Sequence, residues 1–159
     1  MKAKDIMTAS PCTCSPSDSV QDVARAMRDH DCGSVPIVDK GRLVGIVTDR
    51  DLTVRALASG LDPESRVADV ISREPSTVSG DADVSEVERI MSDQQVRRVP
   101  VVDADKHCIG IVSQADLARA SFDGKNLSEH EFALVVERVS LPRTRPYDHS
   151  VELNRDQPL

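Results

Sequence analysis

Aromatic side chains are nearly absent from this sequence. Its 159 residues include two phenylalanines, one tyrosine and no tryptophan. Proteins that bind single-stranded nucleic acid stack bases on exposed rings, and proteins that bind duplexes need a basic face for the phosphates. Here 27 Asp and Glu residues outnumber 20 Lys and Arg residues, for a formal net charge of -7. Nucleic acid is therefore not an expected partner.

Long apolar runs are missing as well. No stretch approaches the roughly 20 consecutive apolar residues of a membrane-spanning helix. The charged start Met1–Asp5 is not followed by the apolar segment of a secretory signal peptide. The sequence therefore predicts a cytoplasmic protein without a membrane partner.

Cysteine is also scarce, with Cys12, Cys14, Cys32 and Cys108 in the whole chain. In a reducing compartment we expect thiols rather than disulfides. The lone Cys-Thr-Cys sequence lacks the second pair that a structural zinc site needs. We therefore predict no metal site and interpret the cysteines as small buried hydrophobic residues. Thiol redox sensing through Cys12 and Cys14 is the alternative.

What the sequence does contain is an internal repeat. Two apolar runs are followed by a hydroxyl residue with an aspartate three positions later, and this series occurs twice. The first copy is Val35–Asp39, Leu43–Val47 and Thr48–Leu52, and the second is Val99–Asp103, Cys108–Val112 and Ser113–Leu117. Such a duplication indicates two copies of one structural unit.

The repeat predicts the secondary structure of each copy. In copy one we expect a strand over 11–15, a helix capped by Ser17, strands over 35–39 and 43–47, and a helix over 49–58. Gly33 is expected to end the first helix. Copy two repeats this plan, with Asp81 as the first cap and a last helix ending near Phe122.

These elements define an α/β (α+β) fold of two β-α-β-β-α repeats. About 60 residues bury too little surface for a stable unit, so the two copies are expected to pack sheet to sheet about a pseudo-twofold axis. We divide the chain into repeat 1 at 1–64, repeat 2 at 65–125, and a C-terminal helix with a flexible tail at 126–159. Ser128 and Glu131 form a capping box at the start of that helix. Its apolar stripe must cover either its own module or a second subunit.

The doubled motif resembles that of a CBS-domain pair, or Bateman module. The features that carry the resemblance are Val-Pro-x-Val-Asp in both copies, followed by Gly-Ile-Val-Thr-x-x-Asp and Gly-Ile-Val-Ser-x-x-Asp. The chain is most similar to the small stand-alone bacterial type. The resemblance implies an adenine nucleotide between the repeats, AMP foremost, with ADP, ATP, NAD or S-adenosylmethionine as alternatives. It also implies a homodimer of CBS pairs.

The residues themselves suit such a ligand. Thr48 lies where a strand becomes a helix, so its hydroxyl and the free N–H groups of the helix face one anion site. Asp51 lies one turn further and can accept hydrogen bonds from a ribose diol. The family uses this pair for phosphate and ribose, and Ser113 and Asp116 are the pair of copy two. Helix capping by the hydroxyls, and first-turn acids favoured by the helix dipole, are the plainer alternatives.

The resemblance also implies that the other copy supplies the wall of each cleft. Arg97 and Arg98 would face the Thr48 cleft and, together with Arg50, bind phosphate oxygens. The first cleft is then expected to take the more highly phosphorylated ligand. The complete set of predicted binding residues is Thr48, Arg50, Asp51, Arg97, Arg98, Val99, Thr77, Ile46, Ser113, Asp116, Gly33, Ser34, Val35, Thr13 and Ile111. Within it, aliphatic side chains hold the adenine and the backbone at Thr13 or Thr77 recognises its edge.

No nucleophile paired with a base is evident, so we predict no enzymatic activity. The sequence favours a non-catalytic regulatory module in which an adenine nucleotide changes the surface offered to a partner protein. The alternatives are a structural dimerisation scaffold with empty clefts and the thiol redox sensor.

Overall fold

Each repeat folds into a helix, a β-hairpin and a second helical segment. The computed structural model describes residues 1–122 and 128–142. Repeat 1 contains α1 (Val20–Asp29), β2 (Ser34–Asp39), β3 (Arg42–Thr48), α2 (Asp49–Asp51) and the π-helix η2 (Leu52–Leu57). Repeat 2 contains α3 (Val84–Gln94), β6 (Arg98–Val102), β7 (Cys108–Ser113) and α4 (Gln114–Phe122). The fold is the predicted one.

The two hairpins match each other residue by residue. In both, the strands are antiparallel, and the proline of the first strand lies opposite an isoleucine of the second: Pro36 opposite Ile46, and Pro100 opposite Ile111. The register shifts once in each hairpin, after Ile37 and after Val101. Equivalent residues of the two sequence copies therefore occupy equivalent positions in the two hairpins.

Each repeat has its own apolar core. The fully buried side chains of the first core are Val23, Val35, Ile37, Val47, Val67 and Val70. Those of the second core are Ala3, Val87, Met91, Val99, Val101, Val112 and Leu117. Both sets lie between a hairpin and its helices, which is why the strands are apolar on nearly every residue.

The N-terminal segments of the two repeats are exchanged in space. The chain start, with η1 (Ala3–Asp5) and β1 (Thr8–Ala9), joins the sheet of repeat 2, whose strand order is β1-β7-β6-β5 with β5 at Val78–Ser79. The segment after the linker, with η3 (Val67–Asp69) and β4 (Ser72–Arg73), joins repeat 1 in the order β2-β3-β4. The predicted boundary at residue 64 stays a prediction, and the exchange ties the two halves together.

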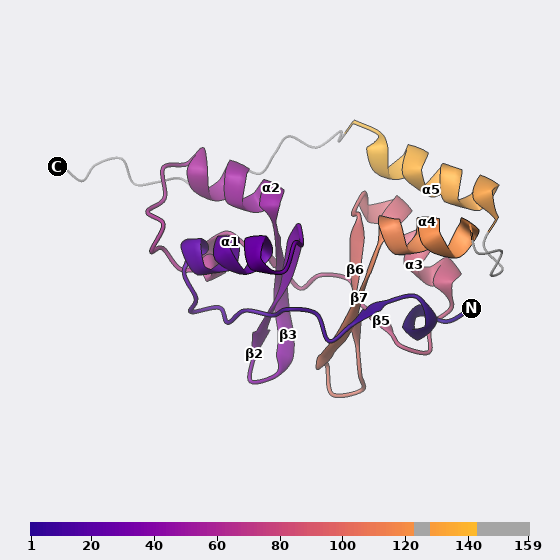
Figure 1. Cartoon of the computed structure of the whole chain (residues 1–159), viewed down its shortest axis with the longest axis horizontal. Coiled ribbons are helices and arrows are strands. Elements are labelled where there is room, and N and C mark those ends of the chain that lie inside the picture. Colours follow the sequence, from indigo (N-terminus) through magenta and orange to yellow (C-terminus); the bar gives the residue numbers. More distant parts are fainter. Residues whose placement is uncertain (123–127, 143–159) are drawn as a thin grey trace.

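The hairpins of the two repeats lie side by side, with the helices turned outward (Figure 1). Their tips touch: the Leu43 N–H donates to the Lys106 carbonyl at 3.0 Å, and Arg42 forms an isolated bridge with His107. The backbone at Lys40 and Gly41 has φ values of 50° and 82°, as the predicted tight turn requires.

Helix α5 (Glu129–Ser140) covers the helices of repeat 2. Its predicted capping box is present, because Ser128 Oγ accepts from the Glu131 N–H and the Glu131 carboxylate accepts from the Ser128 N–H. Val135 and Val139 are buried against α3 and α4. The apolar stripe of α5 therefore packs on its own module, which is the first of the two predicted possibilities. The predicted flexible tail after Pro142 lies outside the described residues.

Two of the predicted helix caps were wrong. The cap of α1 is Ser19 rather than Ser17, because Ser19 has Asp22 in the position that completes a capping box. The cap of α3 is Asp83 rather than Asp81. Asp81 instead forms an ion pair with Lys4 at 2.6 Å, so it helps to hold the exchanged N-terminal segment.

Three further expectations about repeat 1 need correction. Residues 11–15 form no strand; Cys14 makes an isolated bridge to Ile37. Gly33 is not the cap of α1, because the helix ends at Asp29 and its C-cap is His30. The second helix covers the expected range but changes to a π-helix after Asp51. These segments are short, so their apolar and polar patterns do not distinguish a strand from an isolated bridge or an α-helix from a π-helix.

Candidate functional site

The Thr48 turn is a closed capping box at the end of β3. The Thr48 N–H and hydroxyl donate to Asp51 Oδ2 at 2.9 and 2.7 Å, and the Asp51 N–H donates to Thr48 Oγ1 at 3.2 Å. Asp51 Oδ1 lies 3.5 Å from the Arg55 guanidinium. The plainer capping role is therefore real, and a ribose would share this carboxylate with these donors.

The Ser113 turn repeats the same geometry at the end of β7. The Ser113 N–H and hydroxyl donate to Asp116 Oδ2 at 2.7 and 2.6 Å. Arg119 forms an ion pair with Asp116 Oδ1. The Asp116 side chain is only 5% exposed, compared with 14% for Asp51. The two turns are therefore alike in hydrogen bonding but unequal in access.

The arginines Arg55 and Arg119 were missed by the sequence reasoning. Each follows its aspartate on the same helical face, at i+4 in repeat 1 and i+3 in repeat 2. That spacing was a usable signal, since side chains three or four residues apart on a helix are neighbours. Arg55 also donates to the Val70 carbonyl at 3.1 Å, which links the turn to the exchanged segment.

The residues before each Val-Pro lie first beside the turn of their own repeat. Antiparallel pairing puts Ser34 opposite Thr48 and Arg98 opposite Ser113. The Asp49 N–H donates to the Gly33 carbonyl, and the Gln114 N–H donates to the Arg97 carbonyl. Each turn is thus flanked first by its own repeat, because a hairpin brings the start of one strand next to the end of the other.

The side chain of Arg98 nevertheless reaches across to repeat 1. Its Nη2 atom and Oδ2 of Asp49 lie 2.9 and 3.0 Å from the point where a Cβ on Gly33 would sit. Any larger residue at position 33 would push against both groups. A side chain at position 33 would displace these two flexible ends, and Arg98 is the arginine of the predicted wall whose guanidinium lies beside Gly33. Arg50 and Arg97 are exposed.

The residues predicted to hold the adenine differ in exposure. Val35 and Val99 are fully buried, each in the core of its own repeat. Their side chains offer no surface to a ligand in this arrangement. Ile46 is half-buried, Ile111 is 9% exposed, Thr13 is exposed and Thr77 is half-buried. Of these aliphatic residues, Ile46 presents the most surface.

The thiols show no sign of activation. Burial raises the pKa of Cys14 to about 11, and the neighbouring Cys12 thiol adds to the effect. Burial also raises the pKa of Cys12 and of Cys108. All four cysteines are half-buried free thiols, and are thus less buried than the structural interpretation predicts.

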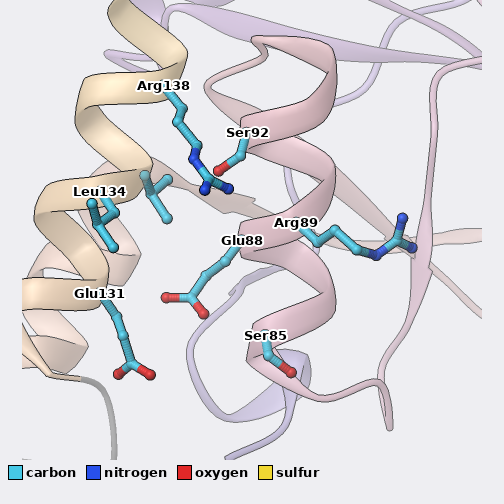
Figure 2. Close-up of a pocket in the computed structure, with 8 residues that line it drawn as sticks. Ser85, Glu88, Arg89, Ser92, Glu131, Leu134 and Arg138 are labelled. Atoms are coloured by element: carbon cyan, nitrogen blue, oxygen red, sulfur yellow. The ribbon is translucent and has the colours of Figure 1, made fainter.

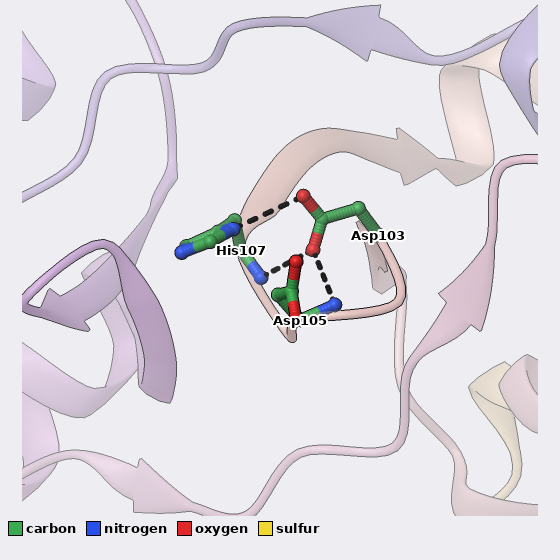
Figure 3. A group of neighbouring side chains, drawn as sticks. All are labelled: Asp103, Asp105 and His107. Carbon is green, nitrogen blue, oxygen red and sulfur yellow. Dashed lines mark hydrogen bonds and ion pairs between the residues drawn. The ribbon is translucent and has the colours of Figure 1, made fainter.

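One cluster on the hairpin tip of repeat 2 has metal-binding residue types. Asp103, Asp105 and His107 lie together (Figure 3), and all three are exposed. Asp103 Oδ1 accepts from the backbone N–H groups of the other two at 2.9 Å each, and His107 Nδ1 lies 3.1 Å from Asp103 Oδ2. These bonds shape the turn and lower the pKa of Asp103.

Two cavities lie on the helical faces rather than at the turns. One, of about 240 Å³, lies between α3 and α5 and contains Glu88, Glu131 and Arg138 (Figure 2). The other, of about 320 Å³, lies between α1 and η2. None of the predicted binding residues lines either cavity.

Comparison with known proteins agrees with the architecture. Residues 3–57 and 67–123 each match the CBS domain family. Hypoxic response protein 1 of Mycobacterium tuberculosis is 37% identical over 142 residues, which is 88% of this chain and 94% of that protein. The chain therefore belongs to the CBS-domain family and carries two CBS repeats.

Solved structures of similar proteins include ligand complexes. A crystal structure of Hypoxic Response Protein I with two coordinated zinc ions has a TM-score of 0.69, covering 75% of this chain and 98% of that one. CBSX2 of Arabidopsis thaliana, in complex with AMP, has a TM-score of 0.68 at 28% identity, covering 79% and 98%. The CBS pair of MJ0100, in complex with 5-methylthioadenosine and S-adenosyl-L-methionine, has a TM-score of 0.71 at 33% identity. The match covers 79% of this chain and 98% of that one.

Proposed function

We propose that this protein is a non-catalytic regulatory module that binds an adenine nucleotide, AMP foremost. The nucleotide would lie beside the Thr48 turn, with phosphate at the Thr48 hydroxyl and ribose at Asp51. Binding favours one arrangement of the repeats and so changes the surface offered to a partner protein. Such a switch works because the ligand binds the two arrangements unequally.

The approach of the Arg98 side chain to Gly33, whose carbonyl accepts from the Asp49 N–H, is the observation that carries this proposal. It brings a cation from repeat 2 next to a helix start in repeat 1, where phosphate would be held by charge and by backbone N–H groups. The adenosine-type ligands of CBSX2 and MJ0100 support the same class of ligand.

The two turns are proposed to differ in affinity. Asp51 is the more exposed aspartate, and Arg98 lies beside its turn. The first turn would therefore take the more highly phosphorylated nucleotide. The second turn, with Asp116 buried, would bind a monophosphate or bind weakly. Equal affinity of both turns for AMP and ATP, measured by calorimetry, would contradict this difference.

A thermal shift measurement tests the proposal directly. At a nucleotide concentration of about 100 times Kd, binding adds about 2.7 kcal/mol to the free energy of unfolding. For a domain of this size, Tm should rise by roughly 5–10 °C. AMP, ADP, ATP, NAD and S-adenosylmethionine are compared at equal concentration, and no shift with any of them would refute nucleotide binding.

Substitution of the aspartates locates the site. Loss of a hydrogen bond to a charged group costs roughly 1.5–3 kcal/mol, so Asp51→Ala should weaken AMP binding about tenfold or more in calorimetry. Asp116→Ala tests the second turn in the same way. Glu64→Ala, an exposed acid outside both turns, is the matched control and should leave the affinity unchanged.

A structural dimerisation scaffold is the second candidate. The observation that favours it is that both aspartates already accept hydrogen bonds from the residues that cap their helices. A scaffold would show no thermal shift with any adenine nucleotide, yet would keep its oligomeric state.

The remaining expectations belong to the same proposal. We infer a cytoplasmic homodimer of CBS pairs that acts on a partner protein and binds neither nucleic acid nor membrane. Within the described residues, none of the helices has the length and apolar character needed to cross a bilayer.

A further inference from the structure

Each exchanged N-terminal segment places an apolar side chain on a glycine of the other repeat. Met7, between η1 and β1, lies over Gly110 of β7. Ile71, between η3 and β4, lies over Gly45 of β3. The sequence repeat makes Ile71 the counterpart of Met7, and it makes the two glycines counterparts of each other. The same contact between the two halves of the molecule is therefore made twice.

Both contacts are close. A Cβ on Gly45 would lie 2.7 Å from Cδ1 of Ile71. A Cβ on Gly110 would lie 2.9 Å from Cγ and 3.2 Å from Cε of Met7, and the Met7 sulfur lies in the space that this Cβ would take. Both glycines are buried. The Met7 thioether therefore packs directly on the backbone of β7, with no room between them for another atom.

The two contacts differ in their chemistry. Isoleucine has no atom that a hydroperoxide oxidises, whereas methionine is converted to its sulfoxide. The sulfur attacks one oxygen of hydrogen peroxide, so that an S–O bond forms and the O–O bond breaks. The proton on the transferred oxygen passes to the other oxygen, which leaves as water. The sulfur loses two electrons and the peroxide gains them, so a peroxide acts on the Met7 contact and not on the Ile71 contact.

Met7 is accessible to a small oxidant. Its side chain is half-buried, and the adjoining β1 is a two-residue strand at the edge of its sheet. Short edge elements of this kind open locally at a low free energy. By contrast, Met91 is fully buried and Met27 is 8% exposed. A hydroperoxide should therefore reach the Met7 sulfur well before it reaches the sulfurs of these core methionines.

The N-terminal segment depends on apolar packing at this place. Two lysine–aspartate ion pairs also hold it, but they lie at the surface, where such pairs contribute little to stability. Its apolar contacts with the core of repeat 2 come from the buried Ala3 and the half-buried Met1, Ile6 and Met7. A sulfoxide is larger and more polar than a thioether. Its oxygen has no room against Gly110, so the oxidised side chain must move away from β7 towards water.

We propose that Met7 is a reversible oxidation site, at which a hydroperoxide loosens the N-terminal segment from repeat 2 while the Ile71 contact stays closed. The oxidised protein keeps both hairpins but loses one of the two matching contacts between its halves. Reduction of the sulfoxide by a methionine sulfoxide reductase restores the contact. The site goes beyond the proposed function, because it requires no nucleotide.

Treatment of the full chain with hydrogen peroxide tests the proposal. Peptide mass spectrometry should find one added oxygen on Met7 well before Met91 is oxidised. Because a polar group then replaces an apolar one in a close contact, Tm should fall by roughly 5 °C. Subsequent treatment with methionine sulfoxide reductase should return Tm to its starting value.

Hydrogen exchange shows which segment is loosened, because the two segments make equivalent hydrogen bonds. The Ala3 N–H donates to the Ala82 carbonyl at 2.9 Å, and its counterpart, the Val67 N–H, donates to the Asp18 carbonyl at 2.8 Å. After oxidation, the Ala3 amide and the Ser10 amide near β1 should exchange at least about tenfold faster. The Val67 amide should keep its rate.

Met7→Leu is the matched control, because it keeps a similar apolar volume without the sulfur. It retains all cysteines and the other methionines, so its Tm and exchange rates should not respond to peroxide. Met7→Gln, with a polar end on a side chain of similar length, should show the behaviour of the oxidised protein without any peroxide. Ile71→Met moves a thioether to the other contact and should make the Val67 amide sensitive to peroxide.

Three results would overturn the proposal. They are a Met7 sulfoxide that leaves Tm and exchange unchanged, an equal loss of Tm in Met7→Leu, or oxidation of Met91 as fast as that of Met7. An equal loss in Met7→Leu would assign the effect to the cysteines or to the other methionines. All of these measurements are made without nucleotide, so a failure of AMP binding would refute the proposed function and leave the oxidation site standing.

Discussion

At the scale of single residues, the hydroxyl of each turn has two roles. In the structure, Thr48 forms a capping box with Asp51; in the proposed complex, the same hydroxyl would also bind phosphate. Thr48→Ala removes the cap, so the free energy of unfolding measured in urea should fall by about 1 kcal/mol. AMP affinity should fall in the same variant. Thr48→Ser keeps the hydroxyl and is the control; it should keep both properties, and a stability loss equal to that of Thr48→Ala would contradict the capping role.

The thiol of Cys14 provides a second test at this scale. A pKa of about 11, against an ordinary value of 9.0, means that little thiolate exists at neutral pH. The lower thiolate fraction outweighs its greater nucleophilicity, so alkylation by iodoacetamide at pH 7.4 should be about tenfold slower than for glutathione. The rate should keep rising beyond pH 9. Mass spectrometry of the modified peptide measures it, and rapid alkylation of Cys14 at neutral pH would revive the redox-sensor alternative.

At the scale of elements, the seam between α3 and α5 contains an unfavourable charge. Glu88 Oε1 is buried and has no hydrogen-bond partner within the described residues. Burial, together with the charge of Glu131, raises the pKa of Glu88 (Figure 2). A carboxylate whose folded pKa is raised destabilises the fold above that pKa. The cost disappears as pH falls below the unfolded value, since the group is then neutral in both states.

Glu88→Gln should therefore raise Tm at pH 7, by an amount equivalent to no more than about 1 kcal/mol because the site is partly solvated. The advantage over wild type should shrink as the pH is lowered towards 4. Glu86→Gln, on the exposed face of α3, is the matched control and should give no such gain. A pH-independent difference between Glu88→Gln and wild type would show that packing, and not charge, is responsible.

The elements also show what a sequence pattern can predict. The hairpins, the α5 capping box and the Thr48 and Ser113 turns follow from local apolar runs and from residue spacing, and they were predicted correctly. The π-helix after Asp51 was not, because the same apolar spacing suits an α-helix over so short a stretch. The cap at Ser19 was missed because Ser17 and Ser19 are both good caps, and only the acid three residues later distinguishes them.

At the scale of the whole molecule, the sequence patterns do not indicate which residues far apart in the chain come into contact. Nothing local to Ala3 indicates that it is buried with Val87 and Leu117 in the other repeat. Likewise, the reach of Arg98 to Gly33 depends on how two hairpins meet, although both hairpins were predicted. The exchange of N-terminal segments makes each core depend on residues from both halves. We therefore expect the two repeats to unfold together in a single cooperative transition.

The contact between the hairpin tips gives a direct test of that coupling. Gly41 and Gly60 both have positive φ values, 82° and 71°, so alanine at either position strains the backbone by roughly 1 kcal/mol. A Cβ at Gly60 would meet nothing within 4 Å, whereas one at Gly41 would lie 3.0 Å from the His107 ring of the other repeat. That ring would have to move, at the expense of its 3.1 Å bond to Asp103. Gly41→Ala should therefore lower the free energy of unfolding in urea more than Gly60→Ala, with one transition in both. Equal losses would mean that the tip contact contributes nothing to stability, and a second transition would mean that the repeats fold independently.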